Sequence, residues 1–463
     1  MDILRKEKKL NIPRILFSAP SSGTGKTTVT CGFLTALKYR NQNVVSYKCG
    51  PDYIDTLFHS NVLNVNCYNM DTFLMGEKNV INLFCQNAFE KQIAVIEGVM
   101  GYYDGIGGIS TDSSTYHIAS LTKTPVILVV NAKGMSLSVV ALLKGFLEYQ
   151  KQSYIKGVIL NDVSEMHYQT LKKLIEKELP LQVYGYLPLK QEFALKSRHL
   201  GLITPQQTEH LQQKMYLLSK QMEKTIQIDE ILELAKTAEP LPFVPQNTSQ
   251  QIQKCRIAVA KDDAFCFYYE DNIQYLKQYG CDIQYFSPLH DNAIPQNIHG
   301  LILGGGYPEL YAKELSENTT MIKSIQCEIN KGLPVYAECG GFLYLHETLE
   351  DMQGKEYTML GVIKAKAVKG ERLKQFGYVT LCAKQNTLLC DEGECIPAHE
   401  FHYWQSTNNG NAFDAVKPLS KKKWQCVHSV GNVFAGFPHI HFYGNTNIAD
   451  NFIKLCCTQV KKS

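Results

Sequence analysis

Short apolar runs alternate with helix-like segments along the chain, and this alternation most constrains what the chain can fold into. In the first half the apolar runs are RILFSA, QNVVSY, QIAVIEG, TPVILVV, KGVILN and LQVYGYL. In the second half the pattern restarts with RIAVA and continues with CDIQYF, GLILGGG and PVYAEC. Strands that alternate with helices form parallel sheets with helices on both faces. The sequence therefore predicts an α/β protein with two such units.

The stretch TAEPLPFVPQNTSQQIQ, residues 237–253, separates the two series. It is rich in Pro and polar residues and has no helical or strand periodicity, which is typical of a linker. We therefore predict two domains, residues 1–240 and residues 241–463. From about Gly354 onward the sequence shows strand-like pieces separated by turns, and their order stays open.

Composition and charge argue against several classes of protein. The chain has 463 residues and is 44% hydrophobic and 20% charged, and its 47 basic and 44 acidic residues give a net charge of +3. This near balance gives no reason to expect nucleic acid binding. The 15 cysteines form no C-x-x-C pair, and no apolar run approaches the ~20 residues of a membrane helix. We therefore expect a cytoplasmic protein with free thiols that binds neither nucleic acid nor membrane.

The segment RILFSAPSSGTGKTTVTCGFL has the strand, Gly-rich loop and helix order of a phosphate-binding loop. Glycines let backbone N–H groups turn toward a phosphate, Lys26 supplies a positive charge, and the Thr27 hydroxyl can ligate Mg²⁺. Pro20 departs from the usual motif, which has glycine there, because Pro offers no N–H. The residues predicted to bind ATP in this loop are Gly23, Thr24, Gly25, Lys26, Thr27 and Thr28.

Polar side chains follow three other predicted strands of the first domain. Asp52 and Asp55 follow QNVVSYKC, and Glu97 ends QIAVIE. Ligands of α/β sheets bind at the carboxyl ends of strands, and a carboxylate there is the usual second anchor for MgATP. The alternative is that Asp52 caps a helix and Glu97 pairs with a lysine. Asn161 ends GVILN, where its amide could contact an adenine edge or cap a loop.

In KGLPVYAECGGFLYL, Cys339 lies between a short buried strand and a helical pattern. Gly340 and Gly341 permit a sharp turn, and the N–H groups and dipole of a helix N-terminus would lower the pKa of a thiol there. The pattern favours a nucleophile, with a buried structural cysteine as the alternative. The N–H groups of Gly340 and of the glycines that end GLILGGG, Gly305 among them, could hold an oxyanion.

An activated cysteine also needs a base. The candidates are His399 and His402 in AHEFHYW, and His439 and His441 in GFPHIHF. Paired histidines could also bind zinc, but these pairs have spacings of three and two residues and no third ligand cluster, which argues against zinc.

Together the motifs resemble the cobyrinic acid a,c-diamide synthase family over nearly the full length. The matching stretches are SSGTGKTTVT, KCGPDYIDTLFH, IEGVMGYYDG, GVILNDV, SRHLGL, RIAVAKDDAFCFYYEDN, LGGGYPE, AECGGFLYL and HEFHYW. The family joins a P-loop ATP domain like that of dethiobiotin synthetase to a flavodoxin-like glutamine amidotransferase domain of class I. The resemblance implies ATP-dependent amidation of the a- and c-carboxylates of cobyrinic acid in cobalamin biosynthesis. Glutamine would supply the ammonia, and ATP and Mg²⁺ would be the cofactors.

The resemblance also implies roles in the glutaminase site. Cys339 would attack the amide carbon of glutamine, form a thioester and release ammonia, with His439 as its base. Related glutaminases have a glutamate two residues after that histidine, where this chain has His441. A Cys–His dyad without an orienting carboxylate is therefore implied. The chain also departs from the family pattern at Ala337, where the elbow usually has glycine, and at Ala398 and Trp404 around HEFHY.

In the ATP domain, the resemblance implies that a macrocycle carboxylate attacks the γ-phosphate and forms an acyl phosphate open to ammonia. Thr27, Asp52 and Glu97 match the metal-site positions of the family. Tyr53, Asp55 and Asp104 match positions that handle substrate or intermediate. Arg198 of SRHLGL is the expected contact to a peripheral carboxylate, because guanidinium binds carboxylate in a bidentate way.

Three alternatives stay open. A Ni-sirohydrochlorin a,c-diamide synthase shares these motifs, whereas cobyric acid synthases differ around HEFHYW. Partitioning-type ATPases carry an extra lysine early in the loop, where this chain has Ser21 and Ser22, and they lack a cysteine elbow. The sequence does not fix the oligomeric state and leaves a homodimer open.

Overall fold

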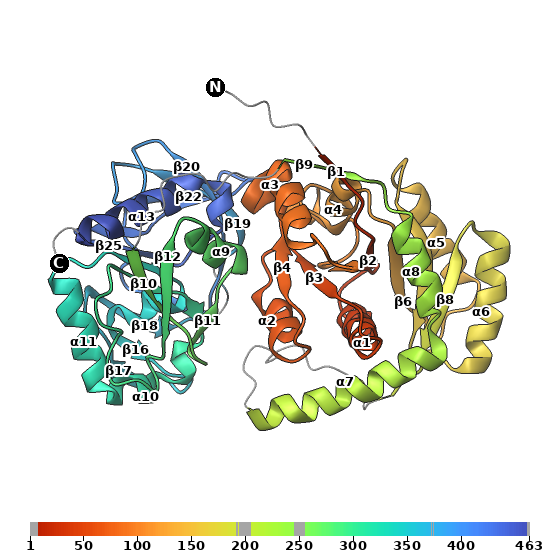
Figure 1. The fold of residues 1–463 in the computed structure, drawn as a ribbon, viewed down its shortest axis with the longest axis horizontal. Helices are drawn as coiled ribbons and strands as arrows, with labels where there is room; N and C mark the ends of the chain where they lie inside the picture. The colour runs from red at the N-terminus through yellow and green to blue at the C-terminus, as the bar shows by residue number, and fades with distance from the viewer. Residues whose placement is uncertain are drawn as a thin grey trace. The chain divides into compact units, whose positions relative to one another are not determined.

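The computed structural model describes residues 8–190, 193, 205–244, 255–371, 373 and 375–460. The chain forms two compact units, one made of residues 1–72 and 76–246 and the other of residues 73–75 and 247–463. Figure 1 shows that each unit has a sheet flanked by helices. Among the described residues, no helix is long and apolar enough to cross a membrane.

The first unit is built on a seven-stranded parallel sheet with the strand order β4-β3-β5-β2-β6-β7-β8. Its strands are β2 (Arg14–Ser18), β3 (Val44–Cys49), β4 (Cys67–Met70), β5 (Ile93–Glu97), β6 (Val126–Asn131), β7 (Ile155–Asn161) and β8 (Gln182–Leu187). Six of them lie in the predicted apolar runs. The strand β4 was not predicted, because its four residues, CYNM, do not form an apolar run.

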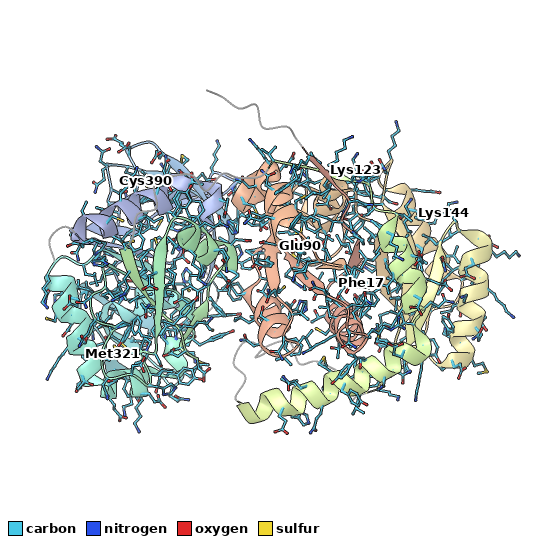
Figure 2. The ribbon with its side chains drawn as sticks, in the orientation of Figure 1. Phe17, Glu90, Lys123, Lys144, Met321 and Cys390 are labelled. Atoms are coloured by element: carbon cyan, nitrogen blue, oxygen red, sulfur yellow. A yellow bond between two sulfur atoms is a disulfide. The ribbon has the colours of Figure 1, made fainter. Side chains whose placement is uncertain are left out.

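Helices connect these strands. They are α1 (Lys26–Tyr39), α2 (Tyr53–Asn61), α3 (Thr72–Asn87), α4 (Thr115–Thr122), α5 (Ser138–Glu148), α6 (Glu165–Glu178), α7 (Pro205–Thr225) and α8 (Ile228–Lys236). The long α7, yellow-green in Figure 1, packs on α1 at Gly32, where an added Cβ would lie 2.9 Å from Leu218. Phe17 of β2, labelled in Figure 2, is fully buried and contacts Phe33 of α1 edge-on at 5.1 Å. Full burial of one such side chain contributes about 1.5–3 kcal/mol.

Part of the predicted linker belongs to the first unit. Strand β9 (Leu241–Phe243) pairs antiparallel with β1 (Lys8–Leu10). Just before it, the carbonyl of Glu239 accepts a hydrogen bond from the buried Arg14 at 2.5 Å, and its carboxylate pairs with Lys123 at 2.8 Å. The prediction of a linker without strands is therefore wrong for this stretch. The strand was not predicted because it contains Pro242, although an edge strand tolerates a residue without an N–H group.

The second unit has a six-stranded sheet with the order β12-β10-β13-β15-β25-β24. Its strands are β10 (Cys255–Ala260), β12 (Cys281–Phe286), β13 (Gly300–Leu303), β15 (Val335–Glu338), β24 (His428–Val430) and β25 (Val433–Gly436). All pairs are parallel except β24 with β25. The helices of this unit are α9 (Glu270–Gln278), α10 (Ala312–Glu317), α11 (Thr319–Asn330), α12 (Gly340–Tyr344) and α13 (Thr446–Val460). The four apolar runs of the second series form β10, β12, β13 and β15, as predicted.

Smaller sheets complete the second unit, and their strand pairs are antiparallel except β16 with β18, which is parallel. One has the order β23-β22-β19-β20-β26 and another β17-β16-β18-β21, while β11 pairs with β14. The strands are β11 (Phe265–Phe267), β14 (Gly305–Gly306), β16 (His346–Glu350), β17 (Glu356–Thr358), β18 (Ile363–Lys369), β19 (Phe376–Ala383), β20 (Cys395–Phe401), β21 (Trp404–Ser406), β22 (Phe413–Val416), β23 (Lys423–Cys426) and β26 (His439–Ile440).

Cys382 and Cys395 lie directly opposite each other on β19 and β20 and form a disulfide. The prediction of free thiols throughout the chain is therefore wrong for this pair. The two cysteines are 13 positions apart in sequence, so only the strand register, which the sequence left open, shows that they meet.

Candidate functional site

The phosphate-binding loop lies between β2 and α1. Gly23 and Gly25 have φ angles of 78° and 99°, a left-handed conformation that favours glycine. A side chain at Gly25 would also collide with Asn161, because an added Cβ would lie 2.4 Å from its Nδ2 atom. That amide donates a hydrogen bond to the carbonyl of Thr24 at 3.0 Å. Asn161 therefore tethers this loop to the end of β7.

Lys26, the first residue of α1, is buried with its ammonium directed at backbone carbonyls. Its Nζ atom donates to the carbonyl of Met100 at 2.5 Å and lies 3.4 Å from that of Ser21. Burial and the nearby charge of Lys48 lower the pKa of Lys26 to about 8, against the opposing attraction of Glu97. A phosphate in the loop would favour the charged form, so Lys26 is suited to bind the phosphates of a nucleotide.

Glu97 is the centre of a buried polar cluster at the end of β5. Its Oε1 atom accepts hydrogen bonds from Thr27 at 2.6 Å and from Lys48 at 2.8 Å. Its Oε2 atom lies 3.2 Å from Nε2 of His59, whose Nδ1 atom lies 2.7 Å from Oγ of Ser46. Burial opposes the charge of Glu97, but Lys48 and His59 outweigh it and hold the pKa of this carboxyl below its usual value.

Lys48 and His59 both contact Glu97, although neither was predicted as a site residue. A signal was present for Lys48, because it is the one charged residue in the strand VVSYKC. Its Nζ also makes a short contact with Asp55. Burial disfavours the ammonium, but Asp55 and Glu97 outweigh it and raise the pKa of Lys48 well above its usual value.

Asp52 caps α2. Its Oδ1 atom accepts hydrogen bonds from the N–H groups of Ile54 at 2.9 Å and Asp55 at 3.1 Å, and its Oδ2 atom lies 4.0 Å from Nζ of Lys48. The alternative to a metal site was that Asp52 caps a helix and that Glu97 pairs with a lysine. Both of these interactions are present.

These residues still fit a magnesium ion held mainly by its nucleotide. Mg²⁺ commonly binds proteins through one or two carboxylates, with phosphates and water as the other ligands. The Thr27 hydroxyl and the Glu97 carboxylate lie together at 2.6 Å, and both are oxygen ligands. Within the described part of the chain, no group of three or more His, Cys, Asp or Glu side chains could hold a metal ion alone.

The remaining residues predicted to contact substrate lie in different settings. Tyr53 begins α2 and is buried. The Asp104 carboxylate accepts a hydrogen bond from the N–H of Gly101 at 2.9 Å and closes a tight turn after β5. Arg198 lies outside the described residues.

In the second unit, Cys339 occupies a sharp turn between β15 and α12. Its φ of 43° and ψ of −102° are unusual for a residue with a side chain, and strain of this kind occurs at functional sites. The two glycines after it are required by close approach of the backbone. An added Cβ at Gly341 would lie 2.1 Å from the carbonyl of Leu303. An added Cβ at Gly340 would lie 3.0 Å from the N atom of Gly306.

His439 of β26 lies beside this turn and is buried. An added Cβ at Gly305 would lie 2.7 Å from Cε1 of His439. Burial opposes the charged ring, but the charge and hydrogen bond of Cys339, followed by Glu338, outweigh it and raise the pKa of His439 to about 10. The structure therefore brings together Cys339, His439, Gly305 and Gly340, an arrangement suited to nucleophilic attack on a carbonyl carbon.

The expected absence of a carboxylate beside His439 is wrong. The Oε2 atom of Glu338 lies 3.4 Å from Nδ1 of His439. The expected position of such a carboxylate was two residues after the histidine, whereas Glu338 directly precedes Cys339 in the chain. A signal existed, because Glu338 is the one carboxylate in the apolar run PVYAEC.

His441 does not stand in the place of that carboxylate. Its ring is fully buried, lies 5.0 Å from the ring of Tyr269, and has its Nε2 atom 4.0 Å from Asp271. Neither ring nitrogen has a hydrogen-bond partner among the described residues. Burial lowers the pKa of His441 to about 3, so the ring is neutral.

The other two histidine candidates lie on or just after β20. His399 is directly opposite His439 in the strand pair β20–β26, and burial, followed by the charge of His439, lowers its pKa to about 3. The Nδ1 atom of His402 lies 2.6 Å from the carbonyl of Trp404, and the ring stacks on Phe437 at 3.7 Å. His402 thus has structural contacts instead of a place beside the thiol.

Comparison with known proteins gives the same division of the chain. Residues 15–203 match the model of the CobQ/CobB/MinD/ParA nucleotide binding domain, and residues 256–447 match that of the CobB/CobQ-like glutamine amidotransferase domain. The first unit is therefore a P-loop nucleotide-binding domain and the second a glutamine amidotransferase domain.

Three curated relatives match nearly the whole chain, and each is a cobyrinate a,c-diamide synthase. The protein of Caldanaerobacter subterraneus subsp. tengcongensis is 40% identical over 96% of this chain and 99% of its own length. That of Listeria innocua is 41% identical over 94% of this chain and 97% of its own length. That of Salmonella typhimurium is 40% identical over 92% of this chain and 94% of its own length. The chain therefore belongs to the cobyrinate a,c-diamide synthase family of glutamine-hydrolysing ligases.

Proposed function

We propose that this chain amidates the a- and c-carboxylates of cobyrinic acid with ammonia from glutamine, at the expense of ATP. The observation that carries the proposal is the presence of two unlike sites in one chain of this family. One is a phosphate-binding loop with Lys26, Thr27 and Glu97. The other is a strained cysteine elbow with a buried histidine.

In the glutaminase site, the thiolate of Cys339 attacks the carboxamide carbon of glutamine. The N–H groups of Gly305 and Gly340 hold the resulting oxyanion, and His439 gives a proton to the leaving ammonia. Water then attacks the thioester, His439 takes a proton from that water, and glutamate leaves as the thiol re-forms. Cys339 and His439 thus exchange one proton between them and are restored after each turnover.

In the ATP site, a carboxylate oxygen of the macrocycle attacks the γ-phosphorus, and ADP leaves. Ammonia then attacks the acyl carbon of the acyl phosphate, and phosphate leaves with the formation of the amide. Lys26 and the loop N–H groups bind the phosphates, while Thr27, Glu97 and Asp52 would hold Mg²⁺, which supplies positive charge to the transferring phosphoryl group. Tyr53, Asp55 and Asp104, which lie near this end of the sheet, would position the macrocycle.

The test is an assay of the purified chain with cobyrinic acid, MgATP and glutamine, in which mass spectrometry follows the conversion of two carboxylates to amides. We expect a diamide that forms only when all components are present. No amidation of cobyrinic acid with either glutamine or ammonium salt would contradict the proposal. Amidation of Ni-sirohydrochlorin in its place would reassign the macrocycle.

A further inference from the structure

Glu338 is the last residue of β15 and directly precedes Cys339. It is 7% exposed, and its carboxylate has three separate neighbours. Its Oε1 atom accepts a hydrogen bond from the N–H of Ile440 at 2.9 Å, and the hydroxyl of Tyr336 makes a short contact with the same atom. Its Oε2 atom lies 3.4 Å from Nδ1 of His439.

The two oxygens of this carboxylate bind two consecutive residues of β26. One oxygen is fixed by the backbone of Ile440, so the other is held at the ring of His439. Tyr336 stacks on Phe434 of β25 at 5.7 Å. This stacking holds the Tyr336 hydroxyl against Oε1 of the Glu338 carboxylate. A residue needed only for packing would not have to be acidic here, because burying a carboxylate costs free energy unless neighbouring groups compensate for it.

We propose that Glu338 orients His439 for catalysis and takes the role that an acidic residue after the histidine has in related glutaminases. This proposal rests on the glutaminase role of Cys339 and His439. With Nδ1–H donated to Oε2 of Glu338, the Nε2 atom is left to exchange a proton with the Cys339 thiol. The carboxylate also stabilises the imidazolium that forms while Cys339 is a thiolate. Glu338 is thus a positioning residue, fixed to the nucleophile by one peptide bond.

The variant Glu338→Gln tests this role. The amide has the size of the carboxylate but no negative charge, and its NH₂ group would favour the wrong tautomer of His439. We expect the glutaminase kcat to fall on the order of 10²- to 10⁴-fold, by analogy with orienting carboxylates in other triads. The rate of Cys339 alkylation by iodoacetamide is measured as a function of pH. In the variant, the midpoint of this pH profile should move to higher pH, because the thiolate loses a stabilised imidazolium. A merely structural role would leave that midpoint in place.

Glu350→Gln is the matched control. Glu350 lies at the end of β16 in the same unit, and its carboxylate accepts a hydrogen bond from the N–H of Lys369 at 2.7 Å, so the same change is made away from Cys339. Wild-type kcat and an unshifted alkylation midpoint in Glu338→Gln would overturn the proposal. If Glu338→Gln does not fold, Glu338→Asp decides, because it keeps the charge but withdraws the carboxylate by one methylene. A reduced kcat with a shifted midpoint supports the proposal, and wild-type values overturn it.

Cys339→Ser is measured in parallel to separate this proposal from the proposed function. If Cys339→Ser retains glutaminase activity, the proposed nucleophile is wrong and the role of Glu338 falls with it. If Cys339→Ser is inactive while Glu338→Gln is unaffected, the nucleophile stands and only the role of Glu338 is refuted.

Discussion

Cys339 and Glu338 lie beside His439 and raise its pKa to about 10 despite its burial. For His441, two residues later, burial lowers the pKa to about 3. In an extended strand, residues two apart point to the same face, so both rings could have faced the site, with only one of them in contact with the thiol. The contacts distinguish the two rings, because Nδ1 of His439 lies 3.4 Å from Glu338, whereas Nε2 of His441 lies 4.0 Å from Asp271.

We therefore predict different losses for the two histidines. His439→Ala should lower the glutaminase kcat on the order of 10²- to 10⁴-fold, since it removes the base. His441→Ala should keep a measurable part of the activity and mainly lower the melting temperature, since it leaves a cavity in the core. Steady-state ammonia release by the two variants decides this assignment, which is reversed if His441→Ala is the less active enzyme.

Lys26 gives a pH dependence with a defined sign. Burial and Lys48 lower its pKa from the ordinary value of 10.5 to about 8. The folded state therefore binds fewer protons than the unfolded state between these pH values. The resulting penalty on folding is fully present below about pH 8 and is relieved as the pH rises toward 10.5.

ATP binding should follow the same titration in the opposite sense. Phosphates prefer the charged lysine, so above pH 8 a proton must be taken up before ATP binds well. The Kd for ATP, measured by calorimetry at constant magnesium, should rise above pH 8 by up to about tenfold per pH unit. Lys26→Arg stays charged over this range and should lose the dependence. An equal pH dependence in both proteins would show that another group is responsible.

At the scale of elements, the cysteine elbow depends on how closely β13 and α12 approach each other. Gly341 has no space for a side chain, because an added Cβ would lie 2.1 Å from the carbonyl of Leu303. The helix α12 could not start here with any other residue unless β13 moved. The glycine pair after Cys339 is therefore a packing requirement as well as a turn signal.

Gly341→Ala should destabilise the second unit by about 1–3 kcal/mol and lower the glutaminase kcat, because overpacking displaces the elbow. Gly145→Ala is the control, since Gly145 lies within α5 and an added Cβ meets nothing within 4 Å. That change should leave stability equal or raise it by up to about 1 kcal/mol through helix propensity. Thermal unfolding and ammonia release measure both effects, and a Gly341→Ala enzyme with wild-type values would contradict the close approach.

Most of the parallel strands were predictable because they are buried on both faces and read as continuous apolar runs. Ile15, Leu16 and Phe17 of β2 are all fully buried, for example. The short β4 and the strand β9 were missed, since a polar four-residue stretch and a proline-containing one give no such run. The strands after Gly354 could not be ordered, because their register depends on contacts between distant residues.

At the scale of the whole molecule, catalytic and binding residues can be predicted from the sequence only where the local backbone requires a particular residue type, such as glycine. The glycines of the phosphate loop have left-handed φ angles, and those of the elbow lie where the backbone closely approaches its neighbours. The sequence predicted both of these turns. The partners of those residues are set by packing. Glu338 meets His439 across 101 residues, and Lys48 meets Glu97 across 49, so neither contact can be read from local sequence.

The central claim is that one unit makes ammonia and the other activates the carboxylate. It is tested most directly by amidation of cobyrinic acid with glutamine or ammonium chloride as nitrogen donor, measured for Cys339→Ala and Lys26→Ala. We predict that Cys339→Ala loses glutamine-dependent amidation and keeps the ammonium-dependent reaction. Lys26→Ala should lose both, because it lacks the charge that stabilises the transferring phosphoryl group. Failure of ammonium to restore Cys339→Ala, or substantial ammonium-dependent turnover by Lys26→Ala, would contradict this division of labour.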